Sequence, residues 1–285
     1  MSAVPLTTVP NLRRSRGAEL SAMCALFALT VRQHLHGRRL LVLCLMYLLP
    51  CVLAAVLRSI PKPAPADLLE FALILNLLPH GLAPLTALLY AGGIIRDEIE
   101  EQTLTYLLLR SVPRWGIYAT KMLATMLVTG LLVALATVAL YVAIYANTPE
   151  FTSEVLRDRL PKIVGIFALA QVAYCALFGF LGLIARRSLL FGIIYITAIE
   201  GVLANLDFVA RSVTIVYYVR TLVVRWMELP ERILHQTNRE WGLSEATMPT
   251  ADQCLRRLVG FAVIATLFAA WWFARREYRV KTPGA

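Results

Sequence analysis

Four acidic residues, crowded together between two long apolar runs, are the side chains best placed for chemistry. They are Asp97, Glu98, Glu100 and Glu101, and no other segment gathers four acids so closely. On a helix, Glu98 and Glu101 lie three positions apart and therefore share one face, where they can pair with basic groups. We expect a polar element that presents carboxylates at a membrane surface.

The residues after this cluster predict a helix, a tight turn and a second helix. The acids come early in the first helix and Arg110 comes late, which suits the helix dipole. Pro113 ends this helix and can begin the next, because proline fits a first helical turn. The second helix runs from Arg114 into the next apolar run. The alternative is a solvated acidic face that only sets membrane topology.

The sequence offers no other reactive constellation. The five cysteines form no CxxC pair and no Cys–His cluster at metal spacing. Paired acids or Ser/His sets do not converge on one predicted membrane face, and no G-x-x-x-x-G-K-[ST] phosphate loop is present. We therefore expect no catalytic residue, metal or cofactor on this chain, which would not be an enzyme by itself.

Composition places the chain in the membrane. Of 285 residues, 59% are hydrophobic and 16% are charged, whereas a soluble domain has about 45–50% apolar and about 25% charged residues. The net charge of +10 could suggest nucleic acid. However, the basic residues fall at the ends of apolar runs, as they do in membrane proteins. We predict an all-α polytopic membrane protein that contacts lipid and does not bind nucleic acid.

Six apolar runs are long enough to cross a bilayer. The predicted spans are 40–57, 71–95, 122–148, 163–185, 188–206 and 258–274. Residues 1–39 predict a tail and an interfacial helix with one apolar stripe, or alternatively an extension of the first span. Segment 96–121 is expected to be cytoplasmic, and segment 207–257 to lie outside.

Basic residues predict the orientation. With the N-terminus inside, the inner segments carry 16 Lys and Arg residues and the outer segments carry 12. Because these residues favour the cytoplasmic side, both termini are expected in the cytoplasm, with the chain in the cell (inner) membrane. Arginines at 211, 220 and 225 argue against a seventh span, since burying one in lipid costs about 2.5–3.5 kcal/mol or more.

A few polar residues fall inside the predicted spans. Glu200 could line a translocation path, or it could pair with Arg211 or reach the outer surface. His80, Asn76 and Gln171 are expected to form hydrogen bonds between helices rather than to bind substrate.

Segment 96–121 and the layout resemble the transmembrane permease of export-type ABC transporters, the type-2 integral membrane subunits. That family carries an E-x-E-x-G-T-L-x-x-L-L-x-x-P-[IV]-S-R-like motif after its second span. The matching residues here are Glu98, Glu100, Thr103, Leu104, Leu107, Leu108, Pro113, Arg114 and Lys121. Gln102 replaces the usual glycine, and Ser-Val-Pro-Arg replaces Pro-Val-Ser-Arg.

The resemblance implies a mechanism and partners. Two permease subunits would pair, as a homodimer here, and each would dock a separate ABC ATPase subunit that holds ATP and Mg. The helices around segment 96–121 would be coupling helices, with Glu98 and Glu101 engaging basic residues of the ATPase and Arg114 and Lys121 steadying the return to the membrane. Two other classes stay open: an accessory or signalling membrane protein without transport, and an intramembrane enzyme.

Overall fold

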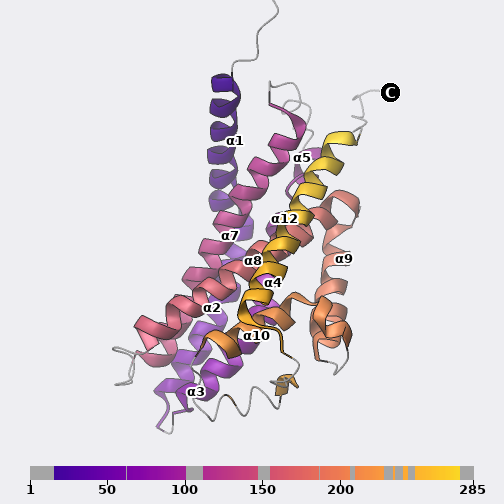
Figure 1. Cartoon of the computed structure of the whole chain (residues 1–285). Helices are drawn as coiled ribbons and strands as arrows, with labels where there is room; N and C mark the ends of the chain where they lie inside the picture. Colours follow the sequence, from indigo (N-terminus) through magenta and orange to yellow (C-terminus); the bar gives the residue numbers. More distant parts are fainter. Residues whose placement is uncertain are drawn as a thin grey trace, which may run out of the picture.

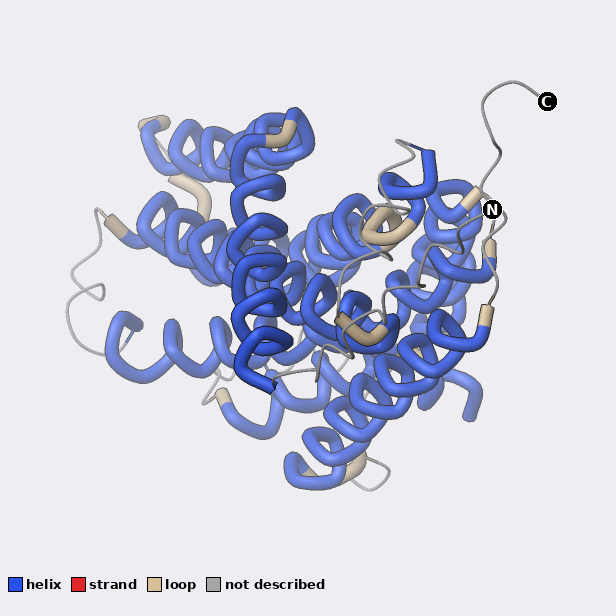
Figure 2. Tube along the Cα trace, turned by 90° about the horizontal axis from the view of Figure 1, so that it is seen from above, coloured by secondary structure: helices blue, strands red, loops and turns tan. Residues whose placement is uncertain are grey.

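The computed structural model describes residues 16–61, 63–100, 112–146, 155–185, 187–205, 209–227, 234, 240–242 and 248–276. Within these residues the chain folds into helices, with no strand (Figures 1 and 2), so the all-α prediction is confirmed. Glu101, Thr103 and Leu104 lie outside the described residues.

Six described helical segments are long and apolar enough to cross a membrane, which confirms an all-α polytopic membrane protein. They are Arg38–Ser59, Ala66–Ile99, Arg114–Tyr145, Arg157–Ile184, Ser188–Asn205 and Ala251–Arg275. Several begin outside the predicted bounds: the third, for example, starts at Arg114 rather than at Met122. An apolar run marks only the hydrocarbon layer, whereas the helix continues past it to satisfy its backbone groups.

Four of these spans have simple bounds. They are α2 (Arg38–Ser59), α7 (Arg114–Tyr145), α8 (Leu160–Ile184), which follows the π-helix η3 (Val155–Arg159), and α12 (Ala251–Arg275). A separate helix, α1 (Arg16–His36), precedes α2, and Gly37 divides the two. The predicted helix before the first span is therefore confirmed.

The second and fifth spans are composite. The second contains α3 (Ala66–Leu69), the π-helix η1 (Glu70–Leu82), α4 (Ala83–Ala91) and α5 (Arg96–Glu100). The fifth contains α9 (Ser188–Ile194), the π-helix η4 (Tyr195–Val202) and the 3₁₀-helix η5 (Leu203–Asn205). Pro79 lies inside η1, and wide π-turns are one way for a helix to absorb a missing N–H.

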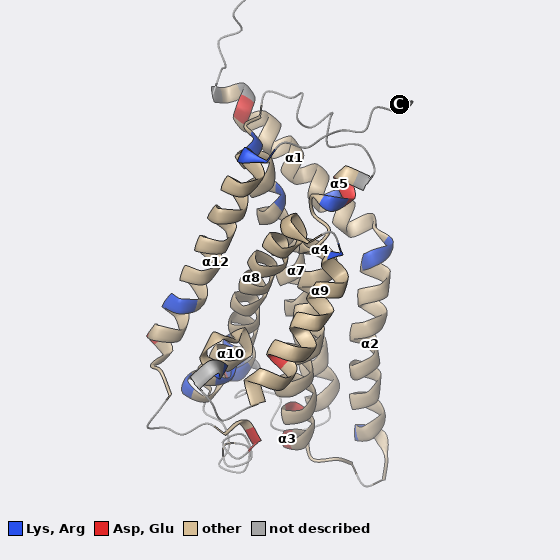
Figure 3. Cartoon of the chain, turned by 90° about the vertical axis from the view of Figure 1, so that its right-hand side faces the viewer, with Lys and Arg blue, Asp and Glu red and all other residues tan. Residues whose placement is uncertain are grey.

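The bundle has two distinct ends. Helix α1 begins, and helix α12 finishes, at the end that carries α5 (Figure 1). We call this the α5 end and the opposite one the α10 end. Figure 3 shows α1 running obliquely across the α5 end, and the described Lys and Arg residues near the two ends of the bundle.

Helix α8 forms the centre of the bundle, where it packs against α12, α7 and α4. Glycines allow close approach: a side chain at Gly182 would collide with the carbonyl of Gly92 on the second span. Small residues at such crossings are typical of membrane helices. The outward sides of α2, α9 and α12 expose large apolar side chains, including Leu41, Phe191 and Ile264.

The helix α10 (Ile215–Trp226) follows the short 3₁₀-helix η6 (Val209–Val213) and lies at the α10 end. Its 12 residues are too few to cross a bilayer, so it is not a seventh span. It packs against α8 and α12, and Val216 and Leu222 are fully buried. Helix α10 is therefore partly embedded in the bundle and does not lie only on its surface.

Candidate functional site

The start of the third span has the predicted form, whereas residues 101–111, which hold the rest of the predicted turn, lie outside the described residues. Pro113 is extended, with φ −64° and ψ 144°, and it caps α7. Its carbonyl accepts hydrogen bonds from the backbone N–H groups of Gly116 (2.9 Å) and Ile117 (3.1 Å). This confirms that a new helix starts at Arg114. The side chains of Arg114 and Trp115 are exposed at the start of α7.

Helix α1 is docked on the first turns of α7. Leu26 forms a small apolar cluster with Val112 and Ile117. Further along α1, His34 Nε2 lies 2.8 Å from Thr125 Oγ1, and the Tyr90 hydroxyl donates to the carbonyl of His34 at 3.2 Å. The helix before the first span is therefore attached to the second and third spans.

Two ion pairs attach α5 to its neighbours. Arg39 on α2 makes a two-pronged contact with Asp97, with Nη1–Oδ2 at 2.6 Å and Nη2–Oδ1 at 2.9 Å, and both side chains are partly exposed. Lys121 on α7 pairs with Glu98, and both are buried. We call these four residues together with His34 the α5 cluster. A pocket of about 650 Å³ lies among them.

The α5 cluster changes the interpretation of Glu98. We expected this carboxylate to face a partner, but the structure buries it against Lys121. The reason is that α7 returns beside α5 and brings a lysine within reach of the acid. The resemblance gave Lys121 the role of steadying the return to the membrane; in the structure its ammonium pairs with Glu98. On α5 the exposed apolar side chain is Ile99.

His34 is neutral in this site. Burial, with added repulsion from Lys121 and Arg39, lowers the pKa of the imidazole to about 4. Since the Thr125 hydroxyl donates its proton to the carbonyl of Lys121 at 2.9 Å, Nε2 of His34 must carry the hydrogen of the His34–Thr125 bond. Nε2 carries this hydrogen in both protonation states, so it is burial of the ring beside Lys121 and Arg39, and not the hydrogen bond, that favours the neutral form.

Glu200 belongs to a second group of polar residues, at the α10 end. Its buried carboxylate accepts the backbone N–H groups of Ile215 (3.1 Å) and Val216 (3.0 Å) and the Tyr195 hydroxyl (3.0 Å). It therefore caps the N-terminus of α10, where a negative charge is stabilised by the helix dipole. The sequence analysis left a pair with Arg211 open as one alternative; in the described structure these partners take its place, and Arg211 donates to the carbonyl of Gly242 at 2.8 Å.

Arg220, which the sequence analysis used only as a charge, is the centre of this second group. Its guanidinium donates to the carbonyl of Ala204 (3.2 Å), to Asn205 Oδ1 (2.8 Å) and to His80 Nε2 (2.5 Å). It also lies 5.1 Å from the centre of the Trp241 ring. We call Glu200, Arg220, His80 and Asn205 the α10 cluster.

Two of the three predicted interhelical hydrogen bonders behave as expected. His80 reaches Arg220 on α10, and Asn76 Oδ1 accepts the Trp241 indole N–H at 3.0 Å. Gln171 does not reach another described helix. Its amide points at Cys175 Sγ, 3.9 Å away on α8, and within the described part of the chain its Oε1 has no hydrogen-bond donor.

Glu70 is a buried carboxylate that the sequence analysis missed. It directly precedes the predicted span 71–95 and was given no role, yet it begins η1 and is fully buried. It accepts hydrogen bonds from the Tyr141 hydroxyl at 2.8 Å and from the Tyr145 hydroxyl, and Arg159 Nη1 lies 3.5 Å from Oε2. The two tyrosines, four apart on α7, were the available signal, because they occupy one helix face.

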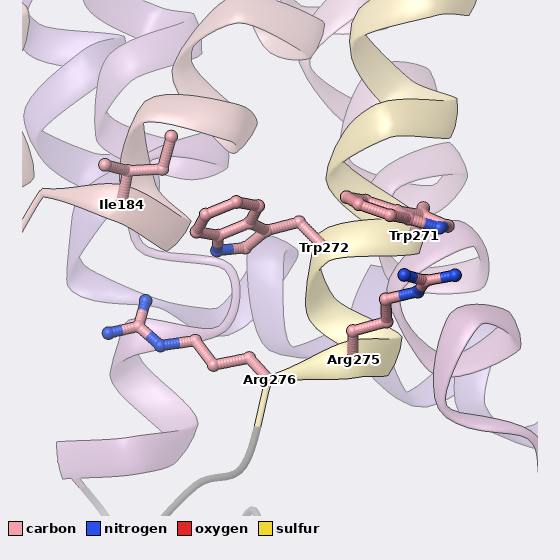
Figure 4. Close-up of a pocket in the computed structure, with 5 residues that line it drawn as sticks. All are labelled: Ile184, Trp271, Trp272, Arg275 and Arg276. Atoms are coloured by element: carbon pink, nitrogen blue, oxygen red, sulfur yellow. The ribbon is translucent and has the colours of Figure 1, made fainter.

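An aromatic and basic rim lies at the α5 end of the bundle. Trp271, Trp272, Arg275 and Arg276 of α12 line a pocket of about 450 Å³ with Ile184 (Figure 4). Arg275 lies 4.4 Å from the centre of the Trp271 ring, and Arg276 donates to the carbonyl of Leu183 at 2.6 Å. Indoles beside arginines are typical of the headgroup region.

The six spans, the polar clusters at both ends and the aromatic rim define a multi-pass α-helical membrane protein. The chain belongs to the family described as "Protein of unknown function (DUF2705)", which it matches over residues 27–279. No curated protein matches the chain.

Proposed function

We propose that this chain is the permease subunit of an export-type ABC transporter, which pairs with a second copy and couples to two separate ATPase subunits. The observation that carries the proposal is the α5 cluster. Ion pairs join α5 to the first span through Arg39–Asp97 and to the third through Lys121–Glu98. A force applied at α5 would therefore reach two spans at once.

In this mechanism the α5 end lies on the cytoplasmic side of the cell membrane. The ATPase, which holds ATP and Mg, binds the end of α5 and the start of α7. Closure of the ATPase pair moves α5, and the dimer shifts between two states. Helix α1 moves with α7, because Leu26 and His34 attach it there.

The contact with the ATPase differs from the one that the acids alone suggested. Glu98 is buried in the ion pair, so it acts as an internal connection. Ile99 and Trp115 are 44% and 54% exposed at the α5 end, and they present apolar surface beside Arg114. Aromatic and arginine side chains are frequent anchors of protein interfaces.

The test is co-purification of the tagged chain with the product of a neighbouring reading frame that carries a Walker-type phosphate loop. We expect a stoichiometric ATPase, and we expect Ile99→Glu with Trp115→Ala to remove it while the permease stays folded. Trp271→Ala is the matched control, because Trp271 is a comparably exposed tryptophan at the same end.

Two outcomes would reject the proposal. One is the absence of any co-purifying ATPase, which would favour a membrane protein without transport. The other is equal loss of the ATPase with Trp271→Ala, which would mean that the end of α5 and the start of α7 are not the contact.

A further inference from the structure

A groove at the α10 end lies between the fifth and sixth spans. Its volume is about 500 Å³, within the range of about 300–1,000 Å³ that is typical of small-molecule sites. The lining comes from α12, from η6 and α10, and from one residue each of α8 and η4, Leu177 and Tyr195. None of the residues that define the α5 and α10 clusters lines it. We call this separate candidate site the α10 groove.

The floor of the α10 groove is buried, whereas its edges face outward. Ile215 of α10 and Leu258 of α12 are buried, while Val213 of η6 and Ile264 of α12 are 74% and 70% exposed. These four side chains are apolar. An apolar chain that lies in the groove would therefore be covered by the protein on one side and bordered by membrane lipid on the other.

Charged and apolar lining residues follow one another along α12. Arg257 lies near the start of this helix, at the α10 end (Figure 1), and Phe261 and Ile264 come four and seven residues later. At 1.5 Å per residue, Ile264 lies about 10 Å from Arg257 along the helix axis. A phospholipid has the same order, because its phosphate lies at the membrane surface and its acyl chains lie below.

Arg257 supplies a positive charge at the entrance of the α10 groove. Its Nη1 donates to the Tyr218 hydroxyl at 3.3 Å, and its guanidinium lies 5.9 Å from the centre of the Tyr218 ring. The neighbouring Arg256 pairs with Asp252 at 3.0 Å, whereas no carboxylate of the described residues pairs with Arg257. Because a guanidinium has five N–H donors in a fork that matches phosphate oxygens, Arg257 can bind a phosphate and keep its contact with Tyr218.

We propose that the α10 groove binds one acyl chain of an anionic phospholipid, whose phosphate lies at Arg257. The second acyl chain lies in the surrounding lipid along the exposed side of α12. The proposal is independent of the ABC transporter assignment, since it rests on the packing of the spans and on these side chains. A bound lipid would connect the fifth and sixth spans, which both pack against α8.

Gly260 provides a variant that closes the groove. It lines the α10 groove, and a Cβ atom there would face open space, so Gly260→Leu adds apolar volume to the groove without a collision at Cβ. Gly130→Leu on α7 is the matched control, because a Cβ atom at Gly130 also faces open space but Gly130 does not line the groove. For the charge, Arg257→Gln is matched by Arg275→Gln at the opposite end of α12.

The experiment uses the full chain in detergent with a phosphatidylglycerol that carries a photoreactive diazirine in one acyl chain. Mass spectrometry of the digested protein locates the crosslinks, which we expect on Val213, Phe261 and Ile264. Gly260→Leu should remove most of these crosslinks, because the added side chain occupies the groove. Gly130→Leu should leave them unchanged.

Competition measures what the entrance recognises. Unlabelled phosphatidylglycerol should displace the photoreactive lipid, phosphatidylcholine with the same chains should displace it less, and glycerol phosphate, which has no acyl chain, should not displace it. Because one arginine near a membrane surface contributes about fivefold in affinity, Arg257→Gln should raise the concentration of phosphatidylglycerol needed for half displacement about fivefold. Arg275→Gln should not change it.

Four results would overturn the proposal. Equal displacement by phosphatidylcholine would show that charge is not recognised, and displacement by glycerol phosphate would assign the site to a soluble anion. Crosslinks spread evenly over lipid-facing residues such as Leu135 and Leu267 would assign the signal to bulk lipid. Unchanged crosslinks in a folded Gly260→Leu protein would place the acyl chain elsewhere; if that variant does not fold, unchanged displacement in Arg257→Gln rejects the site instead.

Discussion

The α5 cluster and the α10 cluster hold their charged side chains in different ways. At the α5 end, carboxylates meet basic side chains: Asp97 pairs with Arg39, and Glu98 with Lys121. At the α10 end, Glu200 is held by two backbone N–H groups and the Tyr195 hydroxyl, and Arg220 is held by a backbone carbonyl, an asparagine and a histidine.

This difference indicates which end of the bundle can change its conformation. Contacts between side chains can be exchanged when an element shifts, because each partner keeps a flexible stem. Contacts with backbone groups fix the position of a whole helix, as Glu200 does for α10. We therefore expect the α10 end to be the rigid part of the bundle and the α5 end to be the part that responds to a partner.

The largest effect is expected from Lys121→Ala. This change leaves Glu98 buried without its cation, which typically costs about 3–5 kcal/mol, and it should lower the midpoint of thermal unfolding in detergent strongly. The double variant Glu98→Gln with Lys121→Met should recover most of the loss, because no buried charge remains. Arg39→Ala removes the cation of the more exposed ion pair. If Lys121→Ala lowered the midpoint of thermal unfolding no more than Arg39→Ala does, this expectation would be contradicted.

The next effect is a pH dependence of the α1–α7 contact. The pKa of His34 is about 4 in the fold, below its ordinary value of 6.5, so the neutral form is favoured by folding. The contribution of neutral His34 to the free energy of unfolding is fully present above pH 6.5 and is lost as the pH falls towards 4. Hydrogen exchange in α1 should accelerate over this range.

A His34→Gln variant is the control for this pH dependence. Glutamine can keep the hydrogen bond to Thr125 but does not titrate, so its α1 exchange should stay flat between pH 6.5 and pH 4 once the intrinsic rate is subtracted. The same acceleration in both proteins would show that another group is responsible.

A moderate effect is expected from Glu200→Gln at the rigid end. The amide can accept from one of the two α10 N–H groups but turns its own NH₂ towards the other, and a hydrogen bond to a charged group contributes about 1.5–3 kcal/mol. Thermal unfolding should show this loss. Asp252→Asn, at an exposed pair with Arg256 on α12, should cost less than about 1 kcal/mol.

The smallest effect is expected from Gly93→Ala. The added methyl group would meet the ends of Arg39 and Asp97, which are flexible, and a partly exposed pair contributes about 0–1 kcal/mol. Gly130→Ala on α7, where the methyl group meets open space, should stabilise slightly because alanine favours a helix. A large loss with Gly93→Ala would show that the α5 end is as rigid as the α10 end.

The sequence by itself determined the number and order of the spans and the helix start after Pro113. These features depend on apolar length and on proline geometry, which are local properties of the chain. It also predicted that His80 and Asn76 would bond between helices, because buried polar groups need partners wherever they lie.

Only the tertiary structure decided which partners the charges have. Lys121 lies 23 residues from Glu98, and Ile215 lies 15 residues from Glu200; these pairs meet because of how helices return and cross, which local patterns do not encode. The same holds for Glu70, which lies outside the predicted spans and is buried because α7 places Tyr141 and Tyr145 beside it. Burial of an acid is decided by its neighbours in space, and these came from distant segments.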